Sequence, residues 1–323
     1  MQAITYAKNG PSSVLELREL PDPEPGPGEV RVRVAFSGIN PVDWKLRAGL
    51  AAPPEPFAIP GFDGAGVIDA VGEGVAAARI GERVWLHYAI MNDGRGTSAQ
   101  MTVVPEAWAV PLPENASMEL GASLGIPALT AHRALTTEGS PAGKTVLVTG
   151  GAGAVGHAAI QLGRWMGARV IATASTDEKA ALAQAAGAEA VIRYREPDSG
   201  EQLGAAAPDG LDLIVDVSLA RNLPLDLAHL RPHATIVAYA DDGGTDASVP
   251  ILSLILKNTT LRFISVTGLA PETLAAAVEG VSGALADGAL QPPPVHPIPL
   301  AQAASAHDLV EAGTLGKVLL EIG

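Results

Sequence analysis

The sequence predicts an α/β protein in which a doubly wound parallel sheet is inserted into a smaller β-rich domain. Three features predict this arrangement: short alternating strands in the first third, strand–helix alternation in the middle, and a tail that ends in a further strand. Alternation of strands with helices is typical of a parallel sheet that helices cover on both faces. We expect the β-rich domain at residues 1–118 and 260–323, and the helix-covered sheet at residues 119–259.

The first third has the pattern of half-buried strands. Glu29–Phe36 alternates valine with arginine or alanine, which is the period of two that a strand requires. Gly64–Val71 and Arg83–His87 are the next predicted strands, and glycines separate them. Short strands with frequent Gly and Pro between them predict a small, partly closed β domain.

The middle of the chain alternates strands with helices. A strand at Lys144–Thr149 precedes a helix at Ala154–Met166, and a strand at Arg169–Ala174 precedes a helix at Asp177–Ala186. Leu211–Val217 is a further predicted strand, and its residues Leu213–Val217 are almost continuously apolar, as expected for a strand covered on both faces. The remaining predicted strands and helices are Ala190–Ile192, Ala234–Ala240, the strand Leu261–Val266, the helix Glu272–Leu285, the helix Leu300–Ala312 and the strand Lys317–Ile322.

The composition excludes several kinds of site. None of the 323 residues is cysteine, which excludes disulfides, thiolate zinc sites, iron–sulfur clusters and cysteine nucleophiles. Lys and Arg total 21 against 35 Asp and Glu, and the resulting charge of −14 disfavours nucleic acid or an anionic membrane as partner. We see neither a signal peptide nor a long apolar span, so we expect a cytoplasmic protein.

A glycine-rich turn carries the strongest local signal. Gly151, Gly153 and Gly156 have the spacing G-x-G-x-x-G, directly after an apolar strand and at the start of a helix. In this context the spacing predicts dinucleotide binding, with a plain glycine-rich turn as the alternative. A Cβ would block the approach of the backbone to a pyrophosphate, and the free amides of the helix start attract its charge. We expect the pyrophosphate at these glycines and at Ala154 and Val155.

The end of the second strand indicates which dinucleotide binds. NAD-binding units place Asp or Glu there to bind the ribose 2′-hydroxyl, but this chain ends the strand with Ala174 and Ser175. Ser175 and Lys179 are suited to a 2′-phosphate, so the pattern favours NADP over NAD. Asp177 is expected to cap the following helix. The alternative for Lys179 is a solvated helix charge.

Six stretches occur in the order in which they occur in one known family. They are Gly38–Asp43, Pro60–Val67, Gly81–Trp85, Leu124–Leu135, Gly150–Gly156 and Gly316–Leu320. Together they resemble the zinc-free medium-chain dehydrogenase/reductases, specifically the ζ-crystallin-like NADPH:quinone oxidoreductases, along the whole chain. The resemblance implies a GroES-like catalytic domain, an inserted Rossmann domain, and a homodimer formed through the Leu261–Val266 strand.

The resemblance also implies roles for individual residues. Asn40 and Asp43 fall on an N-P-x-D motif of the substrate site, and Thr130 falls on a T-A-x-x-A-L motif beside the nicotinamide. Tyr194 falls where related reductases place an aromatic ring beside the 2′-phosphoribose. From the residues alone, Asn40 also fits a polar turn, Asp43 a helix cap or ion pair, and Tyr194 a strand end.

The chain departs from its relatives at informative positions. Phe62 stands where the zinc enzymes have a metal-binding histidine, and without that Lewis acid alcohol oxidation is disfavoured. Lys45 and Ala51 stand where related reductases often have tyrosines. Lys45 is then a candidate contact for an electron-rich oxygen, or otherwise a surface lysine. His87 and Tyr88 are candidate proton donors, or otherwise packing residues.

These observations predict a reaction class. We expect hydride transfer from NADPH to a small molecule, a quinone or a similar conjugated carbonyl. The alternatives are an NADPH-dependent enone or enal double-bond reductase and, from another class, a non-catalytic NADPH-binding structural or sensor protein. The sequence leaves the physiological substrate and the proton donor open.

Overall fold

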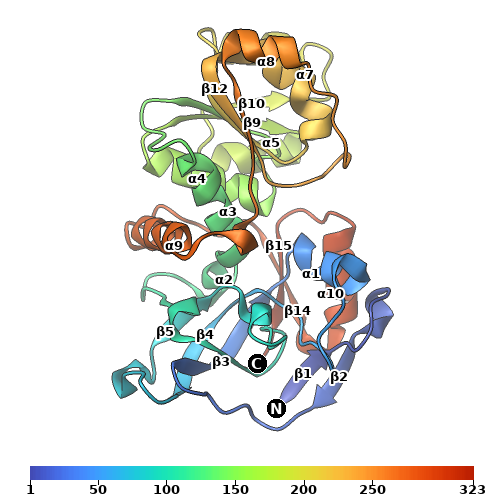
Figure 1. The fold of residues 1–323 in the computed structure, drawn as a ribbon, viewed down its shortest axis with the longest axis vertical. Coiled ribbons are helices and arrows are strands. Elements are labelled where there is room, and N and C mark those ends of the chain that lie inside the picture. The colour runs from blue at the N-terminus through green and yellow to red at the C-terminus, as the bar shows by residue number, and fades with distance from the viewer. The chain divides into compact units, whose positions relative to one another are not determined.

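The computed structural model describes residues 1–323 and divides into two compact units (Figure 1). Unit 1 consists of Met1–Ile126 and Pro294–Gly323, and unit 2 consists of Pro127–Pro293. Unit 2 is therefore inserted into unit 1, which is the arrangement that the sequence predicts. No helix of the structure combines the length and the apolar character that crossing a membrane requires.

Unit 1 is built on an antiparallel sheet with one parallel edge. The strands run in the order β14-β15-β3-β4-β5-β7, and β6 also pairs with β3. Their bounds are β3 (Glu29–Gly38), β4 (Asp63–Val71), β5 (Arg83–Leu86), β6 (Met101–Pro105), β7 (Ala109–Pro111), β14 (Val295–Pro299) and β15 (Lys317–Glu321). A separate ladder joins β1 (Gln2–Thr5) to β2 (Glu16–Glu19). Val30, Val32 and Val34 of β3 are buried, as the alternating pattern predicts.

Three helices complete unit 1. They are α1 (Pro41–Lys45), α2 (Met118–Gly121) and α10 (Ala303–Glu311). A short turn of helix, η2 (Leu46–Leu50), continues α1. Because α1 begins directly after β3 ends, the polar residues of the N-P-x-D motif lie at the end of a buried strand.

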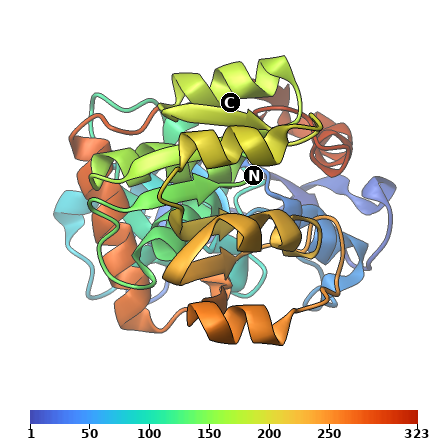
Figure 2. The ribbon, with the colours of Figure 1, turned by 90° about the horizontal axis from the view of Figure 1, so that it is seen from above.

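Unit 2 is a six-stranded parallel sheet in the order β10-β9-β8-β11-β12-β13. Its strands are β8 (Thr145–Val148), β9 (Arg169–Ala174), β10 (Ala190–Arg193), β11 (Leu211–Asp216), β12 (Leu230–Ala238) and β13 (Thr260–Phe263). Its helices are α3 (Gly125–Thr136, which begins in unit 1), α4 (Ala154–Trp165), α5 (Asp177–Ala185), α6 (Ser199–Ala206), α7 (Leu219–His229), α8 (Ile251–Lys257) and α9 (Pro271–Ala286). Figures 1 and 2 show helices on both sides of this sheet. Leu147, Ile171 and Ile214 on its inner strands are fully buried, which explains their apolar runs.

The boundaries of the insertion differ from those that the sequence predicts. The chain returns to unit 1 at Pro294, not at residue 260. The reason is that β13 continues the parallel sheet, with Leu261 in register with Ile236 of β12, and that α9 packs against α4. The first boundary follows Ile126, later than residue 118, because α2 packs on strands of unit 1.

Three helices of unit 2 are absent from the sequence prediction. The helix α7 contains Pro224, a residue that normally argues against a helix interior. The helix α8 is almost wholly apolar and therefore shows no amphipathic period. The helix α6 is short and rich in Gly and Ala, so its pattern is weak.

Candidate functional site

The turn Gly150–Gly156 joins β8 to α4, and two of its glycines are required by packing. A Cβ on Gly156 would lie 2.3 Å from the carbonyl oxygen of Gly150. A Cβ on Gly151 would lie 2.8 Å from the Cβ of Ala172 in β9. These contacts let α4 start in direct contact with the end of the sheet, as a tight βα turn requires.

Gly153 has a different environment from these two glycines. The nearest atom to a Cβ at this position would be 3.4 Å away, so packing does not require glycine there. No side chain caps α4, and its first internal bond runs from the amide of His157 to the carbonyl of Gly153 at 2.8 Å. The amides of Ala154, Val155 and Gly156 therefore have no partner within the helix. Open space beside free amides fits the diphosphate of a dinucleotide.

The turn lies at the point where the strand order of the sheet reverses. Beyond β8 the order runs to β9 on one side and to β11 on the other. The Thr149 hydroxyl donates to Asp216 at 3.3 Å and accepts from the amide of Val217 at 2.9 Å, which ties the ends of β8 and β11 together. In doubly wound sheets the carboxyl ends of the strands at such a point form the dinucleotide crevice.

The residues predicted to recognise the 2′-phosphate gather at the ends of β9 and β10. Ser175 follows β9, and half-buried Lys179 lies in the first turns of α5. Tyr194 follows β10 and is 44% exposed, with the Arg195 guanidinium 5.9 Å from the centre of its ring. The structure therefore places Ser175 and Tyr194 after adjacent parallel strands.

Arg193 is a candidate that the sequence prediction missed. It ends β10, in register with Ala174 at the end of β9, and its guanidinium forms an ion pair with Asp177. Asp177 is not the helix cap that the sequence predicts, because the Thr176 side chain accepts from the amide of Lys179 at 3.3 Å. The position of Arg193 beside Tyr194 is the signal that could have identified it.

A cavity of about 480 Å³ lies at the carboxyl ends of β11, β12 and β13. Tyr239, which follows β12, is among its lining residues and was not singled out from the sequence. Burial, and then the negative charge of Asp216 and Asp242, raises the pKa of Tyr239. The side chain therefore keeps its proton at neutral pH and is able to donate a hydrogen bond.

In unit 1 the predicted residues Asn40 and Asp43 belong to a buried polar cluster. The Asn40 amide nitrogen Nδ2 donates to Asp63 at 2.6 Å, and its Oδ1 accepts from the Lys317 ammonium at 2.6 Å. The backbone amide of Asn40 donates to Asp43 at 2.7 Å. All four side chains are at most 2% exposed. Asp63 and Lys317 are thus partners that the sequence prediction missed.

Burial controls the charges of this cluster. It raises the pKa of Asp43 to about 7 and that of Asp63 to about 6, while the Lys317 charge opposes both shifts. Burial also lowers the pKa of Lys317, whereas the negative charges of Asp63 and Asp43 raise it. Asp63 additionally accepts from the amide of Ile126 at 2.8 Å, at the start of α3. The cluster therefore fixes the starts of α1 and α3.

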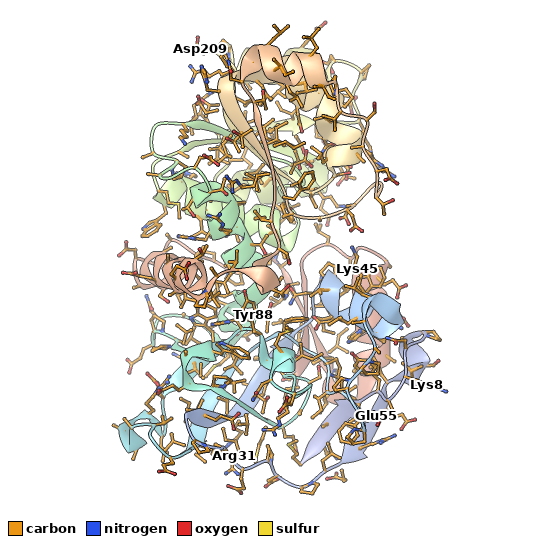
Figure 3. All side chains as sticks on the ribbon, viewed as in Figure 1. Lys8, Arg31, Lys45, Glu55, Tyr88 and Asp209 are labelled. Carbon is orange, nitrogen blue, oxygen red and sulfur yellow. The ribbon has the colours of Figure 1, made fainter.

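Lys45 and Thr130 occupy different settings. Lys45 ends α1 and is half-buried, with its Nζ 5.9 Å from the centre of a Trp44 ring (Figure 3). Thr130 is buried in the middle of α3, in unit 2.

Tyr88 and His87 pack against each other after β5. Tyr88, labelled in Figure 3, has a left-handed backbone with φ of 61°. Its ring meets that of His87 edge-on, with centres 4.9 Å apart. Burial, and then the charge of Asp63, raises the pKa of Tyr88. Burial lowers the pKa of His87 to about 4, so its imidazole is neutral at pH 7 and is a poor proton donor there.

Comparison with known proteins decides the family. Residues 26–114 match the alcohol dehydrogenase GroES-like domain, and residues 154–282 match the zinc-binding dehydrogenase family. The quinone oxidoreductase of Rattus norvegicus is 30% identical over 327 residues, which is 99% of this chain and 97% of that protein. The chain belongs to the quinone oxidoreductase family of medium-chain dehydrogenase/reductases. This confirms the resemblance inferred from the six motifs.

Two further proteins are similar to this chain, one by structure and one by sequence. The Escherichia coli quinone oxidoreductase, solved in complex with NADPH, is 27% identical, with full coverage of both chains and a TM-score of 0.86. The 2-methylene-furan-3-one reductase of Solanum lycopersicum is 33% identical over 67% of this chain and 56% of that protein.

The predicted fold class, enzyme class and cofactor are therefore confirmed. The protein combines a GroES-like domain with a Rossmann parallel sheet, and it is an NADP(H)-dependent oxidoreductase of the medium-chain family. The individual site residues stay predictions.

Proposed function

We propose that this protein delivers hydride from NADPH to a quinone or a similar conjugated carbonyl. The observation that carries the proposal is the row of free amides at Ala154, Val155 and Gly156, beside the open space at Gly153 and at the carboxyl edge of the sheet. Bound NADPH supplies a hydride from its nicotinamide ring. The name of the rat relative supports a quinone as acceptor.

Cofactor selection rests on the ends of β9 and β10. The amides of the glycine turn bind the diphosphate, while Lys179 and Arg193 supply the positive charge that a 2′-phosphate needs. Ser175 adds a hydroxyl, and Tyr194 offers a ring for the adjoining ribose and base. No acidic residue stands at the end of β9, where a carboxylate would favour NADH.

Two kinds of residue are proposed to serve the hydride acceptor: those that fix the shape of its site and those that contact the acceptor itself. Both polar atoms of the Asn40 side chain are occupied within the buried cluster, so Asn40 and Asp43 act by fixing the start of α1. Thr130 is assigned to the nicotinamide by its motif. Lys45, at the end of α1, is the candidate contact for a developing negative oxygen. Tyr88, which keeps its proton at neutral pH, is the candidate donor.

Reduction of a carbon–carbon double bond in an enone is the second candidate activity. The name of the Solanum lycopersicum relative favours it, because a methylene-furanone is a conjugated ketone. Both acceptors delocalise the incoming charge, so the same site suits either.

Steady-state NADPH oxidation separates the two activities. We expect 1,4-benzoquinone and 1,4-naphthoquinone to be turned over with kcat/KM about tenfold or more above that for 2-cyclohexen-1-one, because a quinone becomes aromatic on reduction. Turnover of the enone without turnover of quinones would contradict the proposal that a quinone is the acceptor. Tight NADPH binding without turnover of either would favour a non-catalytic role.

Cofactor selection is tested by fluorescence titration with NADPH and NADH. Lys179→Ala and Arg193→Gln are each expected to raise the Kd for NADPH about tenfold and to leave the Kd for NADH unchanged, because each removes one charge from the 2′-phosphate site. Asp177→Asn is expected to tighten NADPH binding by freeing Arg193.

Arg169→Gln is the matched control for this titration. Arg169 begins β9, at the amino ends of the strands, whereas the proposed cofactor residues lie at the carboxyl ends. Its guanidinium forms an ion pair with Glu189 at 2.8 Å. Its substitution should leave both Kd values unchanged. NADPH affinity that is equal in wild type, Lys179→Ala and Arg193→Gln would contradict the assignment.

We also propose that two copies associate through the free edge of β13. This strand ends the parallel sheet, and no strand of the chain pairs with its outer side. Phe263 of β13 is 70% exposed. The neighbouring helix α8 exposes four further large apolar side chains, at 62–72%: Ile251, Leu252, Ile255 and Leu256. An apolar patch next to an open strand edge favours a second copy as partner.

Sedimentation measures this association. The wild-type protein is expected to have the mass of two chains at micromolar concentration, and Leu256→Glu the mass of one, because the carboxylate would enter the apolar patch. Leu50→Glu is the control, since Leu50 is similarly exposed, at 66%, but lies in unit 1. A wild-type mass of one chain would contradict the proposal.

A further inference from the structure

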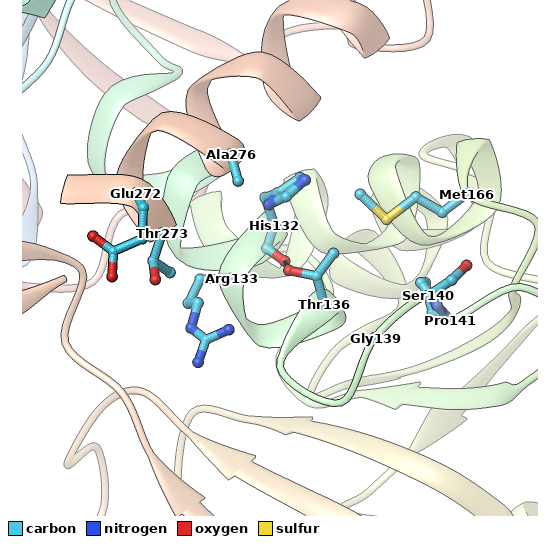
Figure 4. A pocket seen from close by; sticks show the side chains of 10 residues that line it. All are labelled: His132, Arg133, Thr136, Gly139, Ser140, Pro141, Met166, Glu272, Thr273 and Ala276. Atoms are coloured by element: carbon cyan, nitrogen blue, oxygen red, sulfur yellow. Dashed lines mark hydrogen bonds between the residues drawn. The ribbon is translucent and has the colours of Figure 1, made fainter. Parts of the chain in front are cut away.

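A second cavity of unit 2 lies away from the dinucleotide crevice. It has a volume of about 620 Å³, which is within the range of small-molecule sites. Pro141, in the loop before β8, and Met166, at the end of α4, are among its lining residues (Figure 4). Both lie at the amino edge of the sheet, whereas the glycine turn lies at the carboxyl edge. None of the residues that line this cavity belongs to the glycine turn or to the ends of β9 and β10, so it shares no lining residue with the proposed diphosphate and 2′-phosphate sites.

Arg133 supplies an unused positive charge to this cavity. Its side chain is half-buried, and its Nε is buried without a hydrogen-bond partner. Among the ion pairs of residues 1–323 none includes Arg133, although acidic residues outnumber basic ones. Arg31, by contrast, donates to Asp69 at 2.8 Å. A partly desolvated guanidinium without an acceptor indicates a place for an anion.

His132 is a second unsatisfied group in the same wall. It is 8% exposed, and its Nδ1 has no hydrogen-bond partner. A Cβ on Gly280 of α9 would lie 2.0 Å from its Nε2, so this glycine makes room for the ring. Burial, and then the neighbouring charge of Arg133, lowers the pKa of His132, and the ring is neutral at pH 7.

The cavity is charged at one end and uncharged at the other. Figure 4 shows Arg133 and Glu272 toward one end, and Met166 with Ser140 and Pro141 toward the other. Thr136 and Thr273 also line it. Glu272 is the one acidic residue of the lining and repels a second negative charge on any ligand.

We propose that this cavity binds a small amphipathic monoanion, a carboxylate with a hydrocarbon body. The carboxylate pairs with the Arg133 guanidinium, and the hydrocarbon body packs toward Met166 and Pro141. We propose a ligand with a single negative charge because Arg133 can pair with one anionic group, while the nearby Glu272 carboxylate repels a second. This site is separate from hydride transfer and does not depend on the identity of the acceptor.

Isothermal titration with octanoate tests the site, with the dinucleotide crevice saturated by NADPH. We expect saturable binding of one octanoate per chain, tighter than that of acetate, because acetate lacks the hydrocarbon body. Arg133→Gln should weaken octanoate binding about tenfold or more, since a charged hydrogen-bond pair is lost. Glu272→Gln, at an exposed position, should tighten it.

Arg164→Gln is the matched control, because Arg164 is an exposed arginine of the same unit without an ion-pair partner. Its octanoate affinity should equal that of the wild type. Absence of saturable octanoate binding, or equal affinity in wild type and Arg133→Gln, would overturn the proposal. If Arg133→Gln does not fold, an octanoate affinity of Glu272→Gln that is no higher than that of the wild type would overturn it independently.

Discussion

The close approach of α4 to the end of β8 is the constraint on which unit 2 depends. Gly156 allows it, because any Cβ there would meet the carbonyl oxygen of Gly150 at 2.3 Å. The approach sets the free amides of the first turn of α4 at the carboxyl edge of the sheet. There they provide positive charge on a chain whose net charge is −14. In our proposal, these backbone dipoles and a few side chains bind the polyanionic cofactor.

Unit 1 depends on a different constraint, the burial of two carboxylates with one ammonium. Lys317 from the last strand donates to Asn40, and Asn40 donates to Asp63, so three distant parts of the chain meet in one hydrogen-bonded group. Loss of one member would leave buried charges without partners, which is costly. The N-P-x-D motif, which resembles a substrate site, therefore also holds strands and helix starts of unit 1 together.

How far the sequence predicts this structure depends on the range of each interaction. The signals in the glycine turn and at the end of β9 each lie within a few consecutive residues. The sequence alone therefore predicts dinucleotide binding and a preference for NADP. Asp63 and Lys317 meet only through the topology of the sheet, which no local pattern shows. The insertion ends later than predicted because the apolar pattern of Leu261 does not reveal which sheet it joins. The sequence prediction missed α7 because this helix contains Pro224. Helix propensity disfavours proline, but tertiary packing tolerates it at this position.

Titration of NADPH into the wild type and Gly153→Asp tests whether the free amides at the start of α4 bind the cofactor. Packing leaves room for a side chain at Gly153, and Asp is a favourable residue before a helix, so the free energy of unfolding should be unchanged or slightly higher. The new carboxylate would occupy the free amides and repel the diphosphate. This role of the amides predicts a Kd for NADPH about a hundredfold higher for Gly153→Asp and a smaller rise for Gly153→Ala, whose Cβ enters the same space without adding a charge. Equal NADPH affinity in Gly153→Asp and wild type would contradict it.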